Sequence, residues 1–525
     1  MEAACLRHSE IPHTSRLFLD FQYHFDRVAE FYAGSPTDPA YYIAAAQAIQ
    51  YPDDRRAALV SALRARNPES PALARLAEPG TVAVVTGQQV GLFSGPAYTI
   101  YKALTAVRLA AQLTERGIPA VPIFWLATED HDFAEINHCY VYDQRHQPAA
   151  LSVEAHASDR PVGAIPVVHP PFDRLEAALA PFPHGAEIVS MVREAYGEGA
   201  TFGTSFQHLL ERLLAGRGLL FLDPLDEPLR RIAAPLLADA LRQTPDLNVA
   251  LLERNRRLEQ AGYHAQVHVE QKTSLLFLLE DGQRIALRRQ DRSYISKDRR
   301  FSEAELAARP RDLSPNALLR PVMQDYLLPT IAYVGGPAEL AYLAQSQVLY
   351  DKLLGRMPVA VARTAFTLLD APAAQQMRDY HLTLQSFFQA QNGGVGELIA
   401  HRMLPEDLVS QFEVVRGHSA GELDKLRAEL AAFDPTLAAA LDKSRAKILY
   451  QISKLEHKTS RELLRRTERI QSQAESLTGL VYPAKHVQER YYSILPFLAE
   501  HGLDLISRLY ENVNLDCPDH RILTV

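Results

Sequence analysis

The chain is poor in cysteine and has no long apolar run. Its three cysteines, Cys5, Cys139 and Cys517, are far apart, which implies no disulfide framework and leaves no Cys-x-x-Cys metal pair. No stretch reaches the roughly 20 apolar residues of a membrane-spanning helix. The first residues, from Met1 on, lack the basic and apolar parts of a secretion signal. We therefore expect a cytoplasmic protein.

Excess positive charge is also missing. The 525 residues contain 55 Lys and Arg against 63 Asp and Glu, a net charge of −8, and no basic block stands out. This balance disfavours binding to nucleic acid or to an anionic membrane. A hydrophobic fraction of 47% in a chain of this length predicts a globular protein of two to four domains. We expect small-molecule ligands.

Several catalytic motifs are absent as well. The sequence contains no GxxxxGK[ST], HExxH or GxSxG pattern, which disfavours P-loop, zincin and α/β-hydrolase chemistry. His156, His169 and His184 are too irregularly spaced to predict a zinc site, and we expect scattered surface histidines. No metal is predicted.

The most informative segment is an apolar strand followed by a glycine-rich loop and a helix. The strand covers residues 82–85, the loop contains Gly87, Gly91 and Gly95, and the helix covers residues 96–116. Glycines allow a tight turn with exposed backbone N–H groups, and a helix directs its positive end toward an anion. The segment predicts a nucleotide or carboxylate site.

The same strand and helix pattern returns along the chain. Further buried strands are predicted at residues 120–127, 218–223, 330–336 and 359–362, with helices at 227–241 and 337–354. This alternation predicts a doubly wound, Rossmann-like α/β core. It is interrupted by two insertions, at 144–217 and 262–301, and the second alternates as a small antiparallel sheet would. Both insertions are expected to frame a ligand crevice at the carboxyl edge of the core sheet.

The rest of the chain is predicted to be helical, and the N-terminal part up to about residue 76 to be mostly so. After residue 371 the strands stop, and apolar residues recur every seven positions in two sets offset by one residue: Leu441, Ile448, Leu455 and Leu463, Ile470, Leu477. We interpret this as one long helix with a coiled-coil seam. The predicted domains are a core at 1–370, a coiled coil at 371–482, and a final helix and tail at 483–525.

A cluster of ionisable residues follows the second predicted strand. It begins with Glu129, Asp130, His131 and Asp132, and Asn137, His138 and Cys139 come shortly after it. Loops at the carboxyl ends of adjacent parallel strands converge, so this cluster should face the glycine loop across one cavity. Three interpretations remain open: a substrate site, a metal site of His131, Asp132, His138 and Cys139, or helix capping by Asp130 and Asp132.

Two further groups have a functional and a plain interpretation. Gln88 and Gln89 can hold a carboxylate or sugar, and Lys102 a phosphate, but exposed glutamines and surface lysines are common. The turn from Gly335 and Gly336 to Glu339 can approach the ribose or base of a nucleotide, or can simply lead from a strand into a helix.

The segments TGQQVGLFSGPAYTIYKALTA, VPIFWLATEDHDFAEINH and AYVGGPAELAYLAQ resemble the bacillithiol biosynthesis cysteine-adding enzymes, the BshC family. The likeness covers nearly the whole chain. It implies a Rossmann-like core with connecting-peptide insertions, as in class I aminoacyl-tRNA synthetases, and a coiled coil that supports a homodimer. The implied reaction is the last step of bacillithiol synthesis, in which the carboxyl group of cysteine forms an amide with the amine of glucosaminyl malate.

The resemblance and this chemistry together assign roles to the two loops. A carboxylate must be activated before an amine attacks it, so ATP is expected, through an adenylate or an acyl phosphate. The expected catalytic residues are Asp130, His131 and Asp132. The expected substrate-binding residues are Gln88, Gln89, Tyr98, Trp125, Glu129, Asn137 and His138. The expected nucleotide-binding residues are Gly87, Gly91, Gly95, Lys102, Gly335, Gly336 and Glu339.

The sequence departs from the synthetase motifs at two points, and two other functions remain as alternatives to the ligase. The segment from Gly95 to Tyr98 reads GPAY where the synthetases have HIGH, and no KMSKS counterpart is found. The first alternative is a metal-dependent hydrolase or transferase built on His131, Asp132 and His138. The second is a dimeric scaffold that binds a nucleotide without catalysis.

Overall fold

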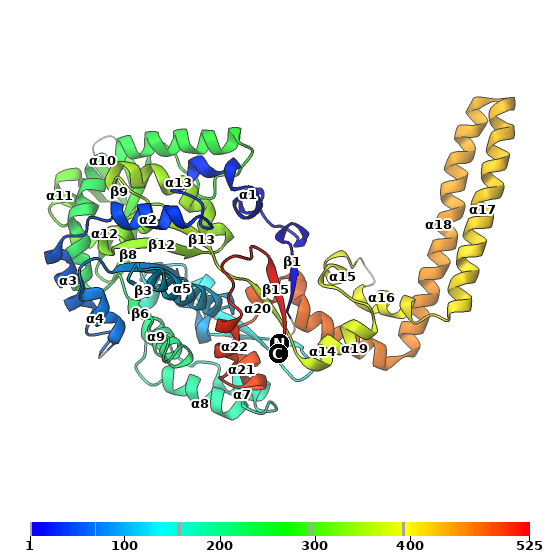
Figure 1. Cartoon of the computed structure of the whole chain (residues 1–525), viewed down its shortest axis with the longest axis horizontal. Helices are drawn as coiled ribbons and strands as arrows, with labels where there is room; N and C mark the ends of the chain where they lie inside the picture. Colours follow the sequence, from blue (N-terminus) through cyan, green and yellow to red (C-terminus); the bar gives the residue numbers. More distant parts are fainter. Residues whose placement is uncertain (1–2, 69, 155–158, 291–292, 297–298, 391–393) are drawn as a thin grey trace.

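The computed structural model describes residues 3–68, 70–154, 159–290, 293–296, 299–390 and 394–525, so His156 lies outside the described residues. A globular body carries a two-helix stalk that projects far from it (Figure 1). The ends of the chain lie side by side near the root of that stalk (Figure 1). None of the described helices combines the length and the apolar character that crossing a membrane requires.

The centre of the body is a sheet of five parallel strands in the order β13-β12-β2-β3-β6. Its strands are β2 (Val82–Gln88), β3 (Ala120–Leu126), β6 (Leu220–Leu222), β12 (Thr330–Gly335) and β13 (Val359–Ala362). Every residue of β3 and β12 is buried, as expected for a sheet covered on both faces. The predicted Rossmann-like fold is confirmed.

Helices cover both faces of this sheet. Alternate residues of β3 belong to different apolar clusters: Phe124 packs with residues of α5 (Tyr98–Glu115), and Ile123 packs with residues of α10 (Glu227–Gln260) and α13 (Pro337–Leu353). The other helices of this part are α1 (Arg16–Tyr23), α2 (Pro39–Ala48), α3 (Asp53–Leu63) and α4 (Pro71–Ala77).

Helix α10 is longer than the predicted 227–241. It continues through Pro235 and Pro245 to Gln260. An internal proline usually ends a helix, because it lacks an N–H group and its ring crowds the preceding turn. Here Leu251 and Leu258 beyond Pro245 are fully buried, and their packing keeps the helix intact.

The two insertions fold differently. The first contains β5 (Pro148–Ser152), which pairs with β4 (His138–Tyr142), and three helices, α7 (Phe172–Leu179), α8 (Gly185–Ala195) and α9 (Phe202–Leu213). The second is antiparallel, as predicted. It consists of β7 (Thr273–Glu280), β8 (Gln283–Gln290), β9 (Ser293–Ser296) and β10 (Arg299–Ser302), extended by β11 (Leu313–Pro315). Short helices flank them: α6 (Phe133–Ile136), α11 (Glu303–Ala307) and α12 (Arg320–Leu327).

The chain ends form a third sheet that the sequence did not predict. Strand β15 (His520–Thr524) lies between β1 (Ala3–Leu6), antiparallel to it, and β14 (Phe366–Leu369), parallel to it. The expectation of no strand after residue 371 was therefore wrong. The N-terminal part is mostly helical, as predicted, apart from the short strand β1. These strands are four or five residues long and their partners are far away in the sequence, so no local pattern marks them.

The predicted C-terminal helix is also divided. It consists of α20 (Gln488–Tyr491), α21 (Leu495–His501) and α22 (Leu505–Glu511). Gly502 ends α21 with a φ of +79°, a conformation in which glycine avoids the strain of a Cβ atom.

The coiled coil is a hairpin and not one long helix. Helices α17 (Glu406–Phe433) and α18 (Pro435–Arg466) pack against each other as the stalk, and α18 ends before α19 (Glu468–Val481) begins. Ile470 and Leu477 are buried in the body, whereas Ile448 and Leu455 on the stalk are 42% and 57% exposed. The second heptad set therefore runs across the break between the two helices, with Leu463 still on α18. Three helices form the root of the stalk: α14 (Ala371–Asp379), α15 (Leu384–Gln389) and α16 (Gly394–Arg402).

A buried ion pair joins the core to the C-terminal segment. Arg363, just after β13, donates two hydrogen bonds to Glu489 of α20, with N–O distances of 2.8 and 2.5 Å. Both side chains are almost fully buried.

We expect Glu489→Ala to lower the free energy of unfolding by about 3–5 kcal/mol, because it leaves a buried guanidinium unpaired. Urea denaturation measures the change. In contrast, Glu462→Ala, which breaks an exposed pair with Arg465, should leave the urea midpoint unchanged, and equal effects would contradict the prediction.

Candidate active site

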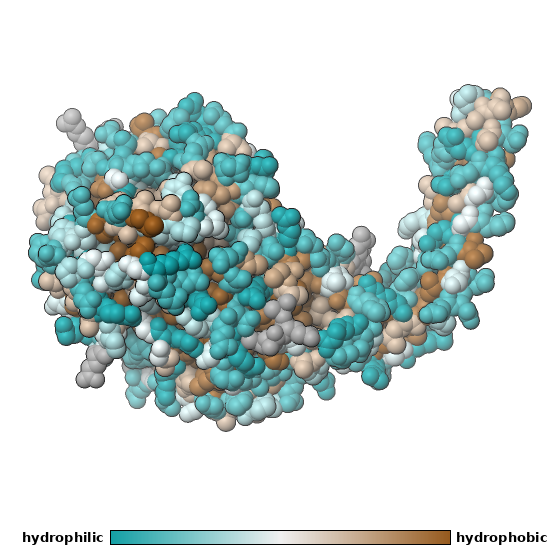
Figure 2. All heavy atoms as spheres, viewed as in Figure 1, coloured by the Kyte–Doolittle hydropathy of each residue, from teal (hydrophilic) through white to brown (hydrophobic). Residues whose placement is uncertain are grey.

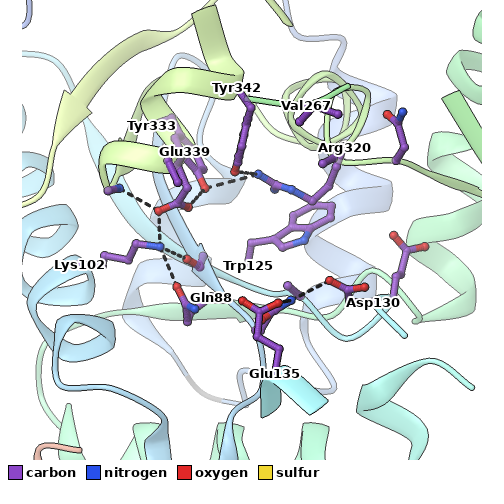
Figure 3. Close-up of a pocket in the computed structure, with 18 of the residues that line it drawn as sticks. Gln88, Lys102, Trp125, Asp130, Glu135, Val267, Arg320, Tyr333, Glu339 and Tyr342 are labelled. Atoms are coloured by element: carbon purple, nitrogen blue, oxygen red, sulfur yellow. Dashed lines mark hydrogen bonds and ion pairs between the residues drawn. The ribbon is translucent and has the colours of Figure 1, made fainter. Parts of the chain in front are cut away.

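A cavity of about 750 Å³ opens at the carboxyl ends of β2, β3 and β12. Gly87 to Gln89, at the end of β2, and Glu129 to His131, after β3, both line it (Figure 3). The parallel pairing of the two strands, with Gly87 opposite Trp125, brings these turns together. The prediction that the two turns face one cavity is confirmed.

The structure divides the predicted site residues into two groups. Those that line the cavity are Gly87, Gln88, Gln89, Tyr98, Lys102, Trp125, Glu129, Asp130, His131, Gly336 and Glu339. Those outside its lining are Gly91, Gly95, Asp132, Asn137, His138 and Gly335. Their individual roles stay predictions, but only the first group is positioned to touch a ligand in this cavity.

The glycine loop is a packed turn and not an exposed anion cradle. A Cβ atom on Gly91 would lie 3.0 Å from Cα of Gly95, so the two glycines allow the loop to fold back on itself. The backbone N–H of Phe93 donates to the hydroxyl of Tyr196, and that of Ala97 to the carbonyl of Tyr492. The N–H groups expected to face an anion are thus used inside the protein.

At position 87, a glycine is required for a different reason. A Cβ atom at this position would lie 2.8 Å from the carbonyl oxygen of Trp125 on the neighbouring strand. The absence of a side chain therefore lets the two strand ends approach closely. This brings Gln88 and Trp125 into the same cavity wall.

The structure does not support the metal interpretation of the second loop. Asp132 caps the short helix α6 by accepting from the N–H of Glu135, and its side chain is exposed. His138 is exposed and bonds through Nδ1 to Asn137, whereas Cys139 is buried. Within the described ranges, these residues and His131 form no group with metal-ligand spacing. The capping interpretation holds for Asp132.

Lys102 forms a buried ion pair with Glu339 in the cavity wall (Figure 3). Its Nζ also donates to the carbonyl of Gly87 and to Oε1 of Gln88, each at 2.8 Å. These three contacts use all three donors of an ammonium group. Burial lowers the pKa of Lys102, an effect that Glu339 opposes. The side chain holds the wall together and has no N–H group left for a phosphate.

Glu339 is held in its ionised form. It accepts from the hydroxyl of Tyr333 at 2.6 Å and from the N–H of Gly336 at 2.8 Å. Burial opposes ionisation, but Lys102 and the N–H of Gly336 hold the pKa of this carboxyl below its usual value. Because the carboxylate caps α13, it fixes the start of that helix at the cavity.

Arg320 of α12 adds a half-buried positive charge. Its Nη2 donates to the hydroxyls of Tyr342 at 2.9 Å and Tyr333 at 3.4 Å, and the guanidinium lies 5.8 Å from the ring of Trp125 (Figure 3). A guanidinium surrounded by aromatic rings can bind a carboxylate or phosphate in a low-dielectric site.

Carboxylates gather at another part of the cavity. Nε2 of Gln89 donates to Asp130 at 2.7 Å and to Glu135 at 2.9 Å, which places the two acids around one amide (Figure 3). Burial opposes ionisation of Asp130, but the hydrogen bond from Gln89 and the charge of Arg284 hold its pKa below the usual value. An ionised carboxylate at this place suits a substrate ammonium group.

Glu129 faces a different partner. Its Oε1 accepts from Arg230 at 2.7 Å, and both side chains are largely buried. Burial raises the pKa of Glu129, although Arg230 and Arg284 favour the charged form. The pair fixes the turn after β3.

The contacts of His131 define which ring nitrogen carries its proton. Nη1 of Arg284 lies 3.0 Å from Nδ1 of His131, and a guanidinium only donates. Nδ1 is therefore the acceptor, and the neutral ring carries its proton on Nε2. Arg284 itself is fixed by the carbonyl of Pro315 at 2.8 Å and by the ring of Phe277 at 3.9 Å. His131 thus offers an N–H group to a ligand.

Among the residues that the structure describes, only the second of the two insertions contributes to the lining of the cavity. It contributes Val267, Phe277 and Arg284. The first insertion instead supports the turn after β3 from behind: the N–H of Gly163 donates to the carbonyl of Thr128 at 3.0 Å, and a Cβ on Gly163 would lie 2.3 Å from Cβ of Thr128. The expectation that both insertions frame the crevice therefore holds for the second insertion and not for the described residues of the first.

The sequence missed several of the lining residues. They are Arg284, Arg320, Tyr333, Tyr342, Arg363, His486 and Arg490. Tyr333 is a polar aromatic residue within an otherwise apolar strand, and this was a usable signal. Arg284 and Arg490 come from segments with no motif, so only the tertiary structure brings them to the cavity.

Comparisons with known proteins cover the whole chain. Residues 1–364 match the family model of the bacillithiol biosynthesis BshC N-terminal Rossmann-like domain, and residues 366–525 match the BshC C-terminal coiled-coil domain. A relative from Solibacter usitatus is 54% identical over the full length of both chains. One from Koribacter versatilis is 35% identical over 99% of each chain, and one from Bacillus cereus strain B4264 is 26% identical over 83% of each. All three are named "Putative cysteine ligase BshC".

We expect Lys102→Met to destabilise the protein by about 3–5 kcal/mol, because it leaves Glu339 as a buried charge without its cation. The double variant Lys102→Met, Glu339→Gln should recover at least about 1 kcal/mol of this loss. Urea denaturation of the two variants and of the unchanged protein measures both the loss of stability and its recovery. Unchanged stability in Lys102→Met would contradict the structural role and favour a ligand contact.

Proposed function

We propose that this chain, which belongs to the BshC family of bacillithiol biosynthesis, is a ligase that joins the carboxyl group of cysteine to the amine of glucosaminyl malate. The observation that carries the proposal is one cavity with two kinds of charge. Asp130 and Glu135 form its acidic part, and Arg320 with Arg490 gives it a basic part. The reaction needs such a division, because its substrates carry both amines and carboxylates.

Substrate recognition follows from these charges. The amine of glucosaminyl malate would lie near Asp130, whose carboxylate accepts hydrogen bonds from it. The malate carboxylates and the cysteine carboxylate would lie near Arg320 and Arg490. Arg490 is exposed at the cavity rim, where an incoming anion meets it.

ATP is proposed as the second ligand of the cavity. It would supply the chemical activation that a carboxylate needs before an amine attacks it. Helix α5 begins at the cavity near Tyr98, and the positive end of its dipole favours a bound anion. Arg490 is the residue best positioned to contact phosphates, since Lys102 and the N–H of Gly336 are already paired.

Asp130 and His131 of the second loop have different roles in the proposed reaction. As the C–N bond forms, the bond from the activated carboxyl carbon to its phosphate-containing leaving group breaks. The carboxylate of Asp130 would stabilise the positive charge on the attacking nitrogen and accept its proton. His131 presents Nε2–H, so it donates a hydrogen bond to the developing negative oxygen. Arg284 keeps the ring in that tautomer.

The test of the reaction is direct. Purified protein is incubated with cysteine, glucosaminyl malate and ATP, and bacillithiol is followed by mass spectrometry. We expect Asp130→Asn to lower kcat/KM by about 10²–10⁴-fold through loss of the proton acceptor. Asp132→Asn is the matched control, because asparagine also caps a helix and this side chain is outside the cavity lining.

A ligand-binding measurement distinguishes an assay that failed for technical reasons from a proposal that is wrong. Trp125 is the chain's single tryptophan and lines the cavity, so its fluorescence reports on ligands there. Cysteine, glucosaminyl malate and ATP should each change this fluorescence. No product and no fluorescence change with well-folded protein would refute the ligase.

We also propose that the stalk pairs with a second copy of the chain. Apolar side chains remain exposed along the stalk, including Val414, Phe433, Ile448 and Leu455, and they interrupt its polar surface (Figure 2). A two-helix hairpin cannot cover both sides of its own apolar seam, and a second hairpin would.

The double variant Ile448→Asp, Leu455→Asp should convert the dimer to a monomer, because charges would enter the shared apolar seam. Sedimentation equilibrium measures the mass. Lys458→Asp, on the exposed face of the same helix, is the control and should remain dimeric. Two monomeric variants, or a monomeric unchanged protein, would contradict the proposal.

A further inference from the structure

A second cluster of ligand-type side chains lies outside the cavity, at the root of the stalk. His146 comes from the turn between β4 and β5, Asp370 precedes α14, and Glu500 lies near the end of α21. One ligand atom from each of the three lies within 4.8 Å of the others. Three segments that are distant in sequence thus bring an imidazole and two carboxyl groups together.

The imidazole of His146 is aimed into this cluster. Its side chain is 9% exposed, and Nε2 lies 3.5 Å from Oδ2 of Asp370. Among the described residues, Nε2 has no hydrogen-bond partner, since the ring bonds only through Nδ1. Two ligands of a tetrahedral zinc ion, each about 2.0–2.2 Å from it, are separated by about 3.4 Å, close to the 3.5 Å between Nε2 of His146 and Oδ2 of Asp370.

Each of the three side chains is held from its other side. Nδ1 of His146 bonds to the hydroxyl of Ser476 at 2.9 Å, and Tyr142 donates to Oε2 of Glu500 at 3.2 Å. Oδ1 of Asp370 accepts from the N–H of Ala373 at 2.5 Å, which leaves Oδ2 toward the cluster. Outer hydrogen bonds of this kind orient the ligands of a metal site.

The backbone also fixes the turn that carries the imidazole. His146 has a φ of +54°, in the left-handed region that a side chain disfavours. Helix α19 packs directly on it: a Cβ on Gly479 would lie 2.1 Å from the carbonyl oxygen of His146. The stalk root therefore holds the imidazole in place from the opposite side.

We propose that His146, Asp370 and Glu500 bind a divalent first-row metal ion, with zinc as the first candidate. Imidazole nitrogen and carboxylate oxygen are donors that zinc accepts together, and two carboxylates offset its charge. Three protein ligands leave one position of a tetrahedral ion for a water molecule. The site is structural, because its ligands tie the first insertion, the root of the stalk and the C-terminal helices to one another.

The experiment measures metal directly and is independent of the ligase reaction. Full-length protein, purified without chelator or metal-affinity tag, is equilibrated with zinc, passed through a desalting column and measured by plasma mass spectrometry. We expect about one zinc ion per chain. Glu500→Gln and His146→Gln should each lower that content at least tenfold, whereas His268→Gln, at an exposed histidine, should not.

A second readout tests the geometry and the folded state. Cobalt in place of zinc should give the visible absorption of a tetrahedral ion, and this absorption should be absent in Glu500→Gln. Circular dichroism checks that the variants are folded. No metal bound by the unchanged protein, or full metal content in both ligand variants, would overturn the proposal. Loss of metal with ligase activity retained would leave the site structural, as proposed.

Discussion

The close parallel pairing of β2 with β3 is the constraint on which the candidate site depends. Only a residue without a side chain fits at position 87 opposite Trp125, and this lets both strands end at the same level. The turn that carries Gln88 and Gln89 then meets the turn that carries Asp130 and His131. A bulkier residue at position 87 would push apart the two turns that form the cavity.

Charge compensation decides which of the many polar groups remain free. Lys102 is paired with Glu339 and Glu129 with Arg230, and these pairs are buried or nearly so. A buried charge without a partner would be costly, so the fold pairs most of the charges it brings to the cavity wall. Asp130 remains partly open to the cavity, and the chemistry we propose relies on it.

The strand β4 connects the two sites of this protein. It begins at His138, just after the loop that carries His131, and leads into the turn that carries His146. Tyr140, in the middle of β4, forms a β-bridge with Tyr492, in the segment that also supplies Arg490 to the cavity. A metal ion bound at the root of the stalk would therefore stiffen elements that end in the cavity wall.

The sequence by itself determined the parallel core strands, the two loops at their ends and the antiparallel nature of the second insertion. These features follow from local signals: buried apolar runs, glycines at turns and two-residue alternation. The family resemblance added the expectation of a ligase. Asp132 and His138 were wrongly grouped with His131 in the metal interpretation, because spacing along the chain does not tell which side chains turn inward.

The tertiary structure alone decided the rest. It brought Arg284 and Arg320 to the cavity from segments without any motif, used up the donors of Lys102, and joined the chain ends through β15. It also gathered His146, Asp370 and Glu500 from three distant segments. Contacts of this kind depend on how whole elements pack, and packing is a property of the complete chain that no short window of sequence contains.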